Sequence, residues 1–122
     1  MDNESNVDKL ELIKSFQSTI RKLENSLDTM TKKGANTTLV KKRLKANYIG
    51  LAIIENVWNQ RPHQYTQEDL VGARNVLTGL LPSIENSYAK LKAGSSPQRT
   101  LLERRIKALE LAVQAIDELS NE

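Results

Sequence analysis

Apolar residues recur along this chain at intervals of three and four, the spacing of one face of an α-helix. Four such segments, separated by short polar joins, predict helices over about residues 5–33, 37–60, 66–92 and 96–121. The 3-4 step is clearest in the first segment and is typical of the seam of a helical bundle. It falls on Ile13, Phe16, Ile20, Leu23, Leu27 and Met30. We therefore expect an all-α protein, with residues 1–122 forming a single helical domain.

Residues that stop or cap helices mark the joins. Gly34 follows the first segment, and Asn36 or Thr37 is expected to cap the second helix. Thr66 and Asp69 have the spacing of a capping box at the start of the third helix, with Asp in place of the usual Glu. Because short joins make neighbouring helices antiparallel, the pattern predicts an antiparallel up-down-up-down four-helix bundle.

The third helix contains residues that disfavour helix. Gly72 and Gly79 each cost about 1 kcal/mol relative to alanine, and Pro82 adds to that cost. The apolar positions keep their phase past Pro82, so we expect one helix with a kink there and not two helices. Two interpretations of the glycines remain open. They allow another helix to pack closely, or they form a hinge.

The second helix is apolar on nearly every side. A helix that is apolar all round is usually buried on every side, whereas a four-helix bundle buries only one side of each helix. One hypothesis is that this helix forms a homodimer or partner interface. The alternative is that neighbouring helices and the adjacent loop cover it. The interface candidates are Ile49, Ile53, Ile54, Val57 and Trp58.

Basic residues are concentrated in two stretches. Residues 21–45 and 85–107 contain 14 of the 18 Lys and Arg but only 4 of the 15 Asp and Glu, in a chain with a formal net charge of +3. If all helices share one axis, the loops put both stretches at the same end. That predicts a basic pole over residues 32–45 and 90–107, which attracts anions. The candidate binding residues are Lys41, Lys42, Arg43, Lys45, Arg99, Arg104 and Arg105.

The basic pole fits an acidic protein partner or nucleic acid. Proteins that bind single strands place aromatic side chains among the charges for base stacking, and here only Tyr48 and Tyr88 come near. No helix-turn-helix, zinc-finger or ribonucleoprotein motif is present. The pole has no Trp or Phe to anchor it in a membrane, so no membrane contact is expected.

The residue types needed for catalysis are scarce. The chain has no Cys and one histidine, His63, which lies in a polar join. Glu55, among apolar residues of the second helix, is the one acid whose burial could signal a site. We expect no enzyme activity, metal, cofactor or small-molecule substrate.

The sequence predicts a small non-enzymatic interaction or regulatory protein that acts through protein–protein contacts, with a nucleic-acid-binding module as the alternative. Its polar, acidic N-terminus is unlike a signal peptide and favours the cytoplasm.

Overall fold

The computed structural model describes residues 6–91 and 96–120 of the 122-residue chain, and these residues form four helices and no strand. The helices are α1 (Asn6–Lys32), α2 (Thr38–Asn59), α3 (Gln67–Lys90) and α4 (Ser96–Ser120). The predicted all-α class and the number of helices are confirmed. The helix bounds lie within two residues of the predicted ranges. The predicted ends at residues 5, 92 and 121 lie outside the described residues.

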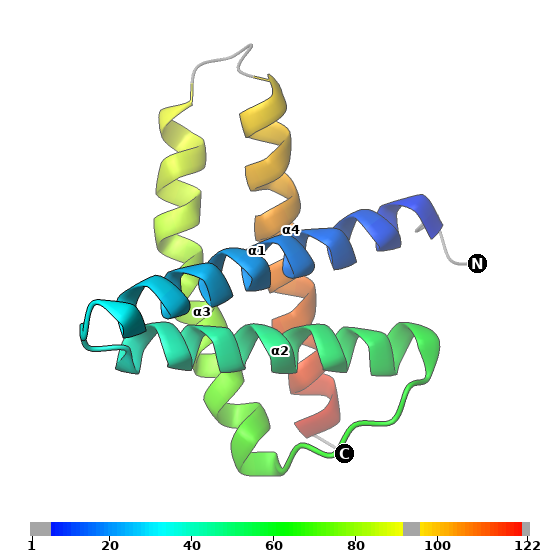
Figure 1. Ribbon diagram of the computed structural model, residues 1–122. Coiled ribbons are helices and arrows are strands. Elements are labelled where there is room, and N and C mark those ends of the chain that lie inside the picture. Colours follow the sequence, from blue (N-terminus) through cyan, green and yellow to red (C-terminus); the bar gives the residue numbers. More distant parts are fainter. Residues whose placement is uncertain (1–5, 92–95, 121–122) are drawn as a thin grey trace.

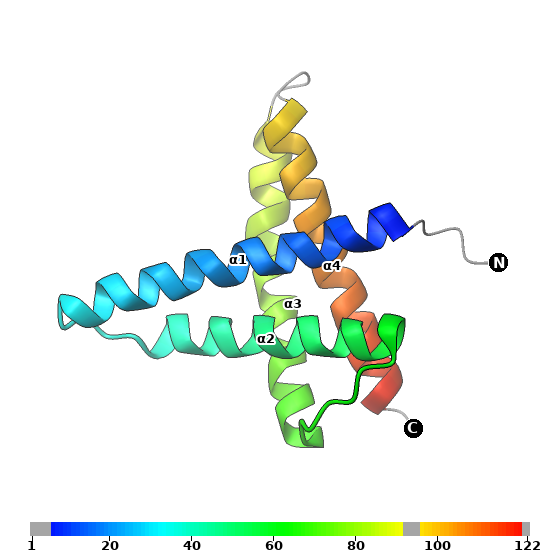
Figure 2. The ribbon, with the colours of Figure 1, turned by 45° about the vertical axis from the view of Figure 1, so that its right-hand side comes forward.

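The helices are arranged as two crossed hairpins (Figures 1 and 2). Helices α1 and α2 run antiparallel in one hairpin, and α3 and α4 run antiparallel in the other. The first hairpin lies across the second, so the four helices do not share one axis. This corrects the predicted up-down-up-down bundle. Short loops make neighbours antiparallel only within a hairpin, whereas the longer segment between α2 and α3 allows the chain to change direction.

That segment begins at a defined helix end. Gln60 has a left-handed backbone conformation, with φ of 58°, and its N–H donates to the carbonyl oxygen of Glu55. The side-chain amide of Asn56 donates to the carbonyl oxygen of Arg61 at 2.8 Å. Both bonds satisfy polar groups at the C-terminus of α2, where carbonyls lack helical partners. The chain leaves α2 there and reaches α3, which crosses it.

Small residues lie where the hairpins cross. A Cβ atom built on Gly50 of α2 would lie 3.1 Å from Leu77 Cδ1 of α3 and 3.1 Å from Phe16 Cε1 of α1. Ala46 of α2 and Ala112 of α4 are also buried. The distance between packed helices depends on the side chains at the contact, so these small residues allow the layers to approach closely.

Helix α2 packs against α1, α3 and α4. These three helices bury Ile49, Ile53 and Ile54, whereas Tyr48 and Val57 of the same apolar stretch stay 39% and 45% exposed. Each helix contributes large side chains to the common core, among them Phe16 in α1, Ile53 in α2, Leu77 in α3 and Ile116 in α4. Burying one such side chain contributes about 1.5–3 kcal/mol to the stability of the folded state, relative to leaving it exposed to water.

Helix α3 continues through Pro82 as a single helix. The expectation of one helix is therefore confirmed, while the kink stays a prediction. Gly72 and Gly79 are exposed, and among the described residues no atom beyond the local backbone of α3 lies within 4 Å of a Cβ built on either one. The interpretation that another helix of this chain packs closely on these glycines is therefore wrong. The glycine that does permit close packing is Gly50, and the hinge stays a prediction.

The predicted capping box forms at the start of α3. The hydroxyl of Thr66 accepts a hydrogen bond from the backbone N–H of Asp69 at 3.0 Å. The Asp69 carboxylate accepts one from the backbone N–H of Thr66 at 3.1 Å. At the start of α2, Thr37 occupies the cap position without a side-chain bond, and the side-chain Oδ1 of Asn36 accepts from the backbone N–H of Thr38 at 2.9 Å. Side chains thus satisfy N–H groups that have no helical partner.

Candidate functional site

The structure separates the two basic stretches. Residues 21–45 lie at the outer end of the first hairpin, whereas Lys90 and Arg99 lie near the outer end of the second (Figures 1 and 2). Because the hairpins cross, these two ends point in different directions. The single basic pole predicted for residues 32–45 and 90–107 is therefore divided into two parts, and Lys92 lies outside the described residues.

We call residues 21–45 the basic hairpin end. It carries eight exposed cationic side chains and only two acidic ones. Both acids have partners within the hairpin, since Asp28 pairs with Lys32 at 3.1 Å and Glu24 accepts a hydrogen bond from the hydroxyl of Tyr48. That bond is the main reason why the pKa of Tyr48 is raised. The eight cations are Arg21, Lys22, Lys32, Lys33, Lys41, Lys42, Arg43 and Lys45.

Most cations of the basic hairpin end are available for binding. Only Lys32 and Lys45 form ion pairs with described residues, Lys45 with Asp69 at 3.4 Å. Lys41, Lys42 and Arg43 lie in the early turns of α2, whose first turn contains no acidic residue. The N-terminal end of a helix carries a partial positive charge, so the dipole and these side chains attract anions together.

The predicted binding residues of α4 take part in contacts within the chain. The Arg99 guanidinium stacks 4.6 Å from the ring centroid of Tyr88 and donates to its hydroxyl at 2.8 Å. That hydroxyl donates to Glu103 at 2.6 Å, and this bond is the main reason why the pKa of Tyr88 is raised. Arg104 pairs with Glu11 of α1 at 3.0 Å. These two arginines connect helices of the same chain.

Arg105 occupies a different environment on α4. Its side chain is partly buried, and its Nε atom is buried without a hydrogen-bond partner among the described residues. It lines a surface groove between α1 and α4 together with Lys14 and Arg104. Of the predicted binding residues on α4, none is as exposed as the lysines of the basic hairpin end.

The predicted interface on α2 is mostly core. Ile49, Ile53 and Ile54 have exposed fractions of 1%, 0% and 1%. Within this chain they face other helices, which corrects their assignment to an intermolecular surface. Val57 is 45% exposed, and Trp58 is partly buried beneath the ammonium group of Lys9, 5.6 Å from its ring centroid. For these three isoleucines the alternative holds, because neighbouring helices of the same chain bury them.

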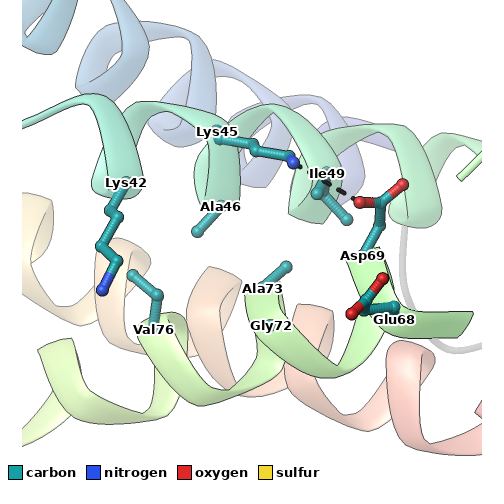
Figure 3. Close-up of a pocket in the computed structure, with 9 residues that line it drawn as sticks. All are labelled: Lys42, Lys45, Ala46, Ile49, Glu68, Asp69, Gly72, Ala73 and Val76. Carbon is teal, nitrogen blue, oxygen red and sulfur yellow. Dashed lines mark ion pairs between the residues drawn. The ribbon is translucent and has the colours of Figure 1, made fainter. Parts of the chain in front are cut away.

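A groove of about 330 Å³ lies between α2 and α3 (Figure 3). Lys42 stands on α2 at one end of the groove, and Glu68 and Asp69 stand on α3 at the other end. Lys45 of α2 extends toward Asp69. Between its two ends the groove is lined with small or apolar residues: Ala46, Ile49, Gly72, Ala73 and Val76. Sequence reasoning did not identify this groove. The one available signal was Gly72, a costly residue in the interior of a helix.

The two residues considered for chemistry have ordinary environments. His63 is partly buried in the segment between α2 and α3, where its Nδ1 accepts a hydrogen bond from the N–H of Tyr65 at 3.2 Å. Its ring stacks on that of Tyr65 with centroids 6.2 Å apart. Glu55 is partly buried on α2 and does not line the α2–α3 groove. His63 packs within the segment between α2 and α3, and Glu55 packs on α2.

Within the described residues, no cluster of three or more His, Cys, Asp or Glu side chains could hold a metal ion. Among the same residues, no helix combines the length and the apolar character that a membrane span requires.

Comparison with known proteins yields no relative. No family model, curated protein or solved structure matches the chain.

Proposed function

We propose that this protein is a small, non-enzymatic interaction protein that binds an acidic segment of another protein through its basic hairpin end. The observation that carries the proposal is the imbalance of charge in residues 21–45. Eight exposed cations stand against two acids, and both acids already have partners inside the hairpin. An excess of unpaired cations on one end of a molecule attracts anionic partners and speeds their association.

The composition of this surface favours an acidic protein over a nucleic acid. Binding of single strands relies on aromatic side chains that stack on the bases. Tyr48 is the aromatic side chain nearest in sequence to these cations; it is 39% exposed, and its hydroxyl is held by Glu24. Carboxylates of an acidic peptide require only ammonium and guanidinium groups, which this end supplies. The proposal retains the expected cytoplasmic location.

The proposal is tested by charge reversal. A triple variant, Lys33→Glu, Lys41→Glu and Arg43→Glu, removes three exposed cations that form no ion pair with a described residue. The probe is a fluorescent poly-glutamate peptide of about 20 residues, titrated by anisotropy at low salt. We expect the dissociation constant to rise by at least about tenfold, since each exposed charge contributes up to about 1 kcal/mol.

The matched control reverses three exposed cations elsewhere, Lys14→Glu, Arg61→Glu and Lys90→Glu, and should bind almost as tightly as the wild type. Absence of binding by the wild type at low salt, or equal losses in both variants, would contradict the proposal. Single- and double-stranded oligonucleotides of similar length serve as competing probes. Tighter binding of these oligonucleotides, with a steep salt dependence, would favour the nucleic-acid alternative.

A further inference from the structure

The groove between α2 and α3 carries opposite charges at its two ends. Lys42 lies at one end and Glu68 at the other (Figure 3). Neither side chain forms an ion pair with a described residue, whereas their neighbours Lys45 and Asp69 pair with each other at 3.4 Å. The groove therefore presents one unpaired cation and one unpaired anion to whatever binds there.

The surface between these charges is small and apolar. Gly72 lies in the groove, and Gly79 follows seven residues later on the same side of α3. Both glycines are exposed, and no described atom beyond the local backbone of α3 lies within 4 Å of a Cβ built on either. Each lowers the stability of the helix by about 1 kcal/mol relative to alanine, and no packing contact with a described residue explains that loss. A face without side chains allows a second helix to approach closely.

We infer that the groove between α2 and α3 binds a second copy of this chain, in a symmetric dimer with two α3 helices packed antiparallel near Gly72. A twofold interface uses the same patch on both subunits, so residue i of one contacts residue j of the other and the reverse. The groove meets this requirement through its charges. Rotation about an axis near its centre places Lys42 of each copy against Glu68 of the other, which forms two ion pairs.

The inference does not depend on the proposed function. Lys42 and Lys45 belong to the basic hairpin end and also line the groove, whereas Lys33, Lys41 and Arg43, which the poly-glutamate test reverses, do not line it. A protein that dimerises through the groove without binding poly-glutamate would support the inference and contradict the proposed function. A monomer that binds poly-glutamate would do the opposite.

Charge exchange tests the dimer. Sedimentation velocity on the full chain at low salt, up to about 500 μM protein, should detect a wild-type monomer–dimer equilibrium in this concentration range. Lys42→Glu alone places two carboxylates against each other twice in the dimer, and Glu68→Lys alone does the same with two ammonium groups. Each single variant should weaken dimerisation by about tenfold or more.

Restoration of the dimer is the decisive result. Mixing the two single variants should give a heterodimer in which both contacts again join opposite charges, so its dissociation constant should approach that of the wild type. The double variant Lys42→Glu with Glu68→Lys should also dimerise.

The matched controls Lys33→Glu and Glu110→Lys change the net charge equally and should leave dimerisation unchanged. Circular dichroism checks that every variant is folded. A wild type that remains monomeric at the highest concentration, or single variants that do not restore each other, would overturn the inference.

Discussion

At the scale of single residues, the three glycines of the described helices have opposite environments. Gly50 lies at the crossing of the hairpins, with Leu77 and Phe16 both 3.1 Å from a built Cβ. Gly72 and Gly79 have open space instead. All three sit in helix interiors, so their helix propensity is the same and only their tertiary neighbours distinguish them. Sequence reasoning considered close packing at Gly72 and Gly79, and the structure assigns it to Gly50.

This difference predicts opposite effects of alanine. Gly50→Ala should lower the free energy of unfolding by about 1 kcal/mol or more, because the cost of overpacking exceeds the gain in helix propensity. Leu77 and Phe16 are buried, with exposed fractions of 0% and 2%, so neither can move aside freely. Gly79→Ala, the matched control, should raise the free energy of unfolding by about 0.5–1 kcal/mol. Urea denaturation measures both. A stabilising Gly50→Ala would show that the crossing is looser than described.

At the scale of elements, the start of α3 is set by residues close together in sequence. The reciprocal bonds between Thr66 and Asp69 lower the pKa of the Asp69 carboxyl, with the backbone N–H of Thr66 as the largest cause and Lys45 as a smaller one. A carboxyl whose pKa is lower when folded stabilises the protein above its unfolded pKa of about 4. That contribution is lost as the pH falls through the folded value.

The capping box therefore predicts a pH dependence. Asp69→Asn should lower the melting temperature at pH 7, because the charged acceptor is lost. The difference from the wild type should shrink as the pH falls below about 4 and through the lowered pKa of Asp69, where its carboxyl gains a proton. Thermal unfolding followed by circular dichroism measures the difference across this pH range. Glu68→Gln, next to Asp69 but outside the cap, should show a smaller dependence. An Asp69→Asn deficit that stays constant with pH would contradict the assigned charge effect.

At the scale of the whole molecule, each hairpin buries its apolar face against the other. Phe16 and Ile53 in the first hairpin and Leu77 and Ile116 in the second belong to one core. A hairpin on its own would expose these side chains to water, and most of the stability of a protein helix comes from the tertiary packing of its apolar face. The two hairpins therefore depend on each other for stability.

A fragment experiment follows from this dependence. A peptide of residues 1–62 should show low helicity and no cooperative thermal transition, and a peptide of residues 63–122 should behave likewise. Mixing the two at about 100 μM should restore helicity and a cooperative transition if the shared core forms between them. Far-UV circular dichroism measures both properties. Cooperative unfolding of the first peptide alone would show that the α1–α2 hairpin is a stable unit.

Prediction from sequence succeeded for features that depend on neighbouring residues. The periodicity of apolar positions identified four helices, and Thr66 with Asp69 identified the cap of α3. Prediction from sequence failed for features that depend on the angle at which one helical hairpin crosses the other. The basic residues Lys41 and Arg99 were expected at one end, yet they lie on different hairpins. The apolar residues Ile49 and Ile53 were proposed as an interface, yet α2 lies among three other helices that bury them.

The sequence by itself determined the four helices, the capped start of α3 and the concentration of cations in residues 21–45. These follow from backbone hydrogen bonding, side-chain period and composition, all of which are local. The tertiary structure alone decided that the hairpins cross, that Ile53 is core, and that Lys42 and Glu68 face a common groove. A stripe of apolar residues indicates which face of a helix is buried, but it does not fix the angle between helices, because helices pack stably at several crossing angles. The choice among those angles depends on close contacts such as those at Gly50, which become visible only when the helices are assembled.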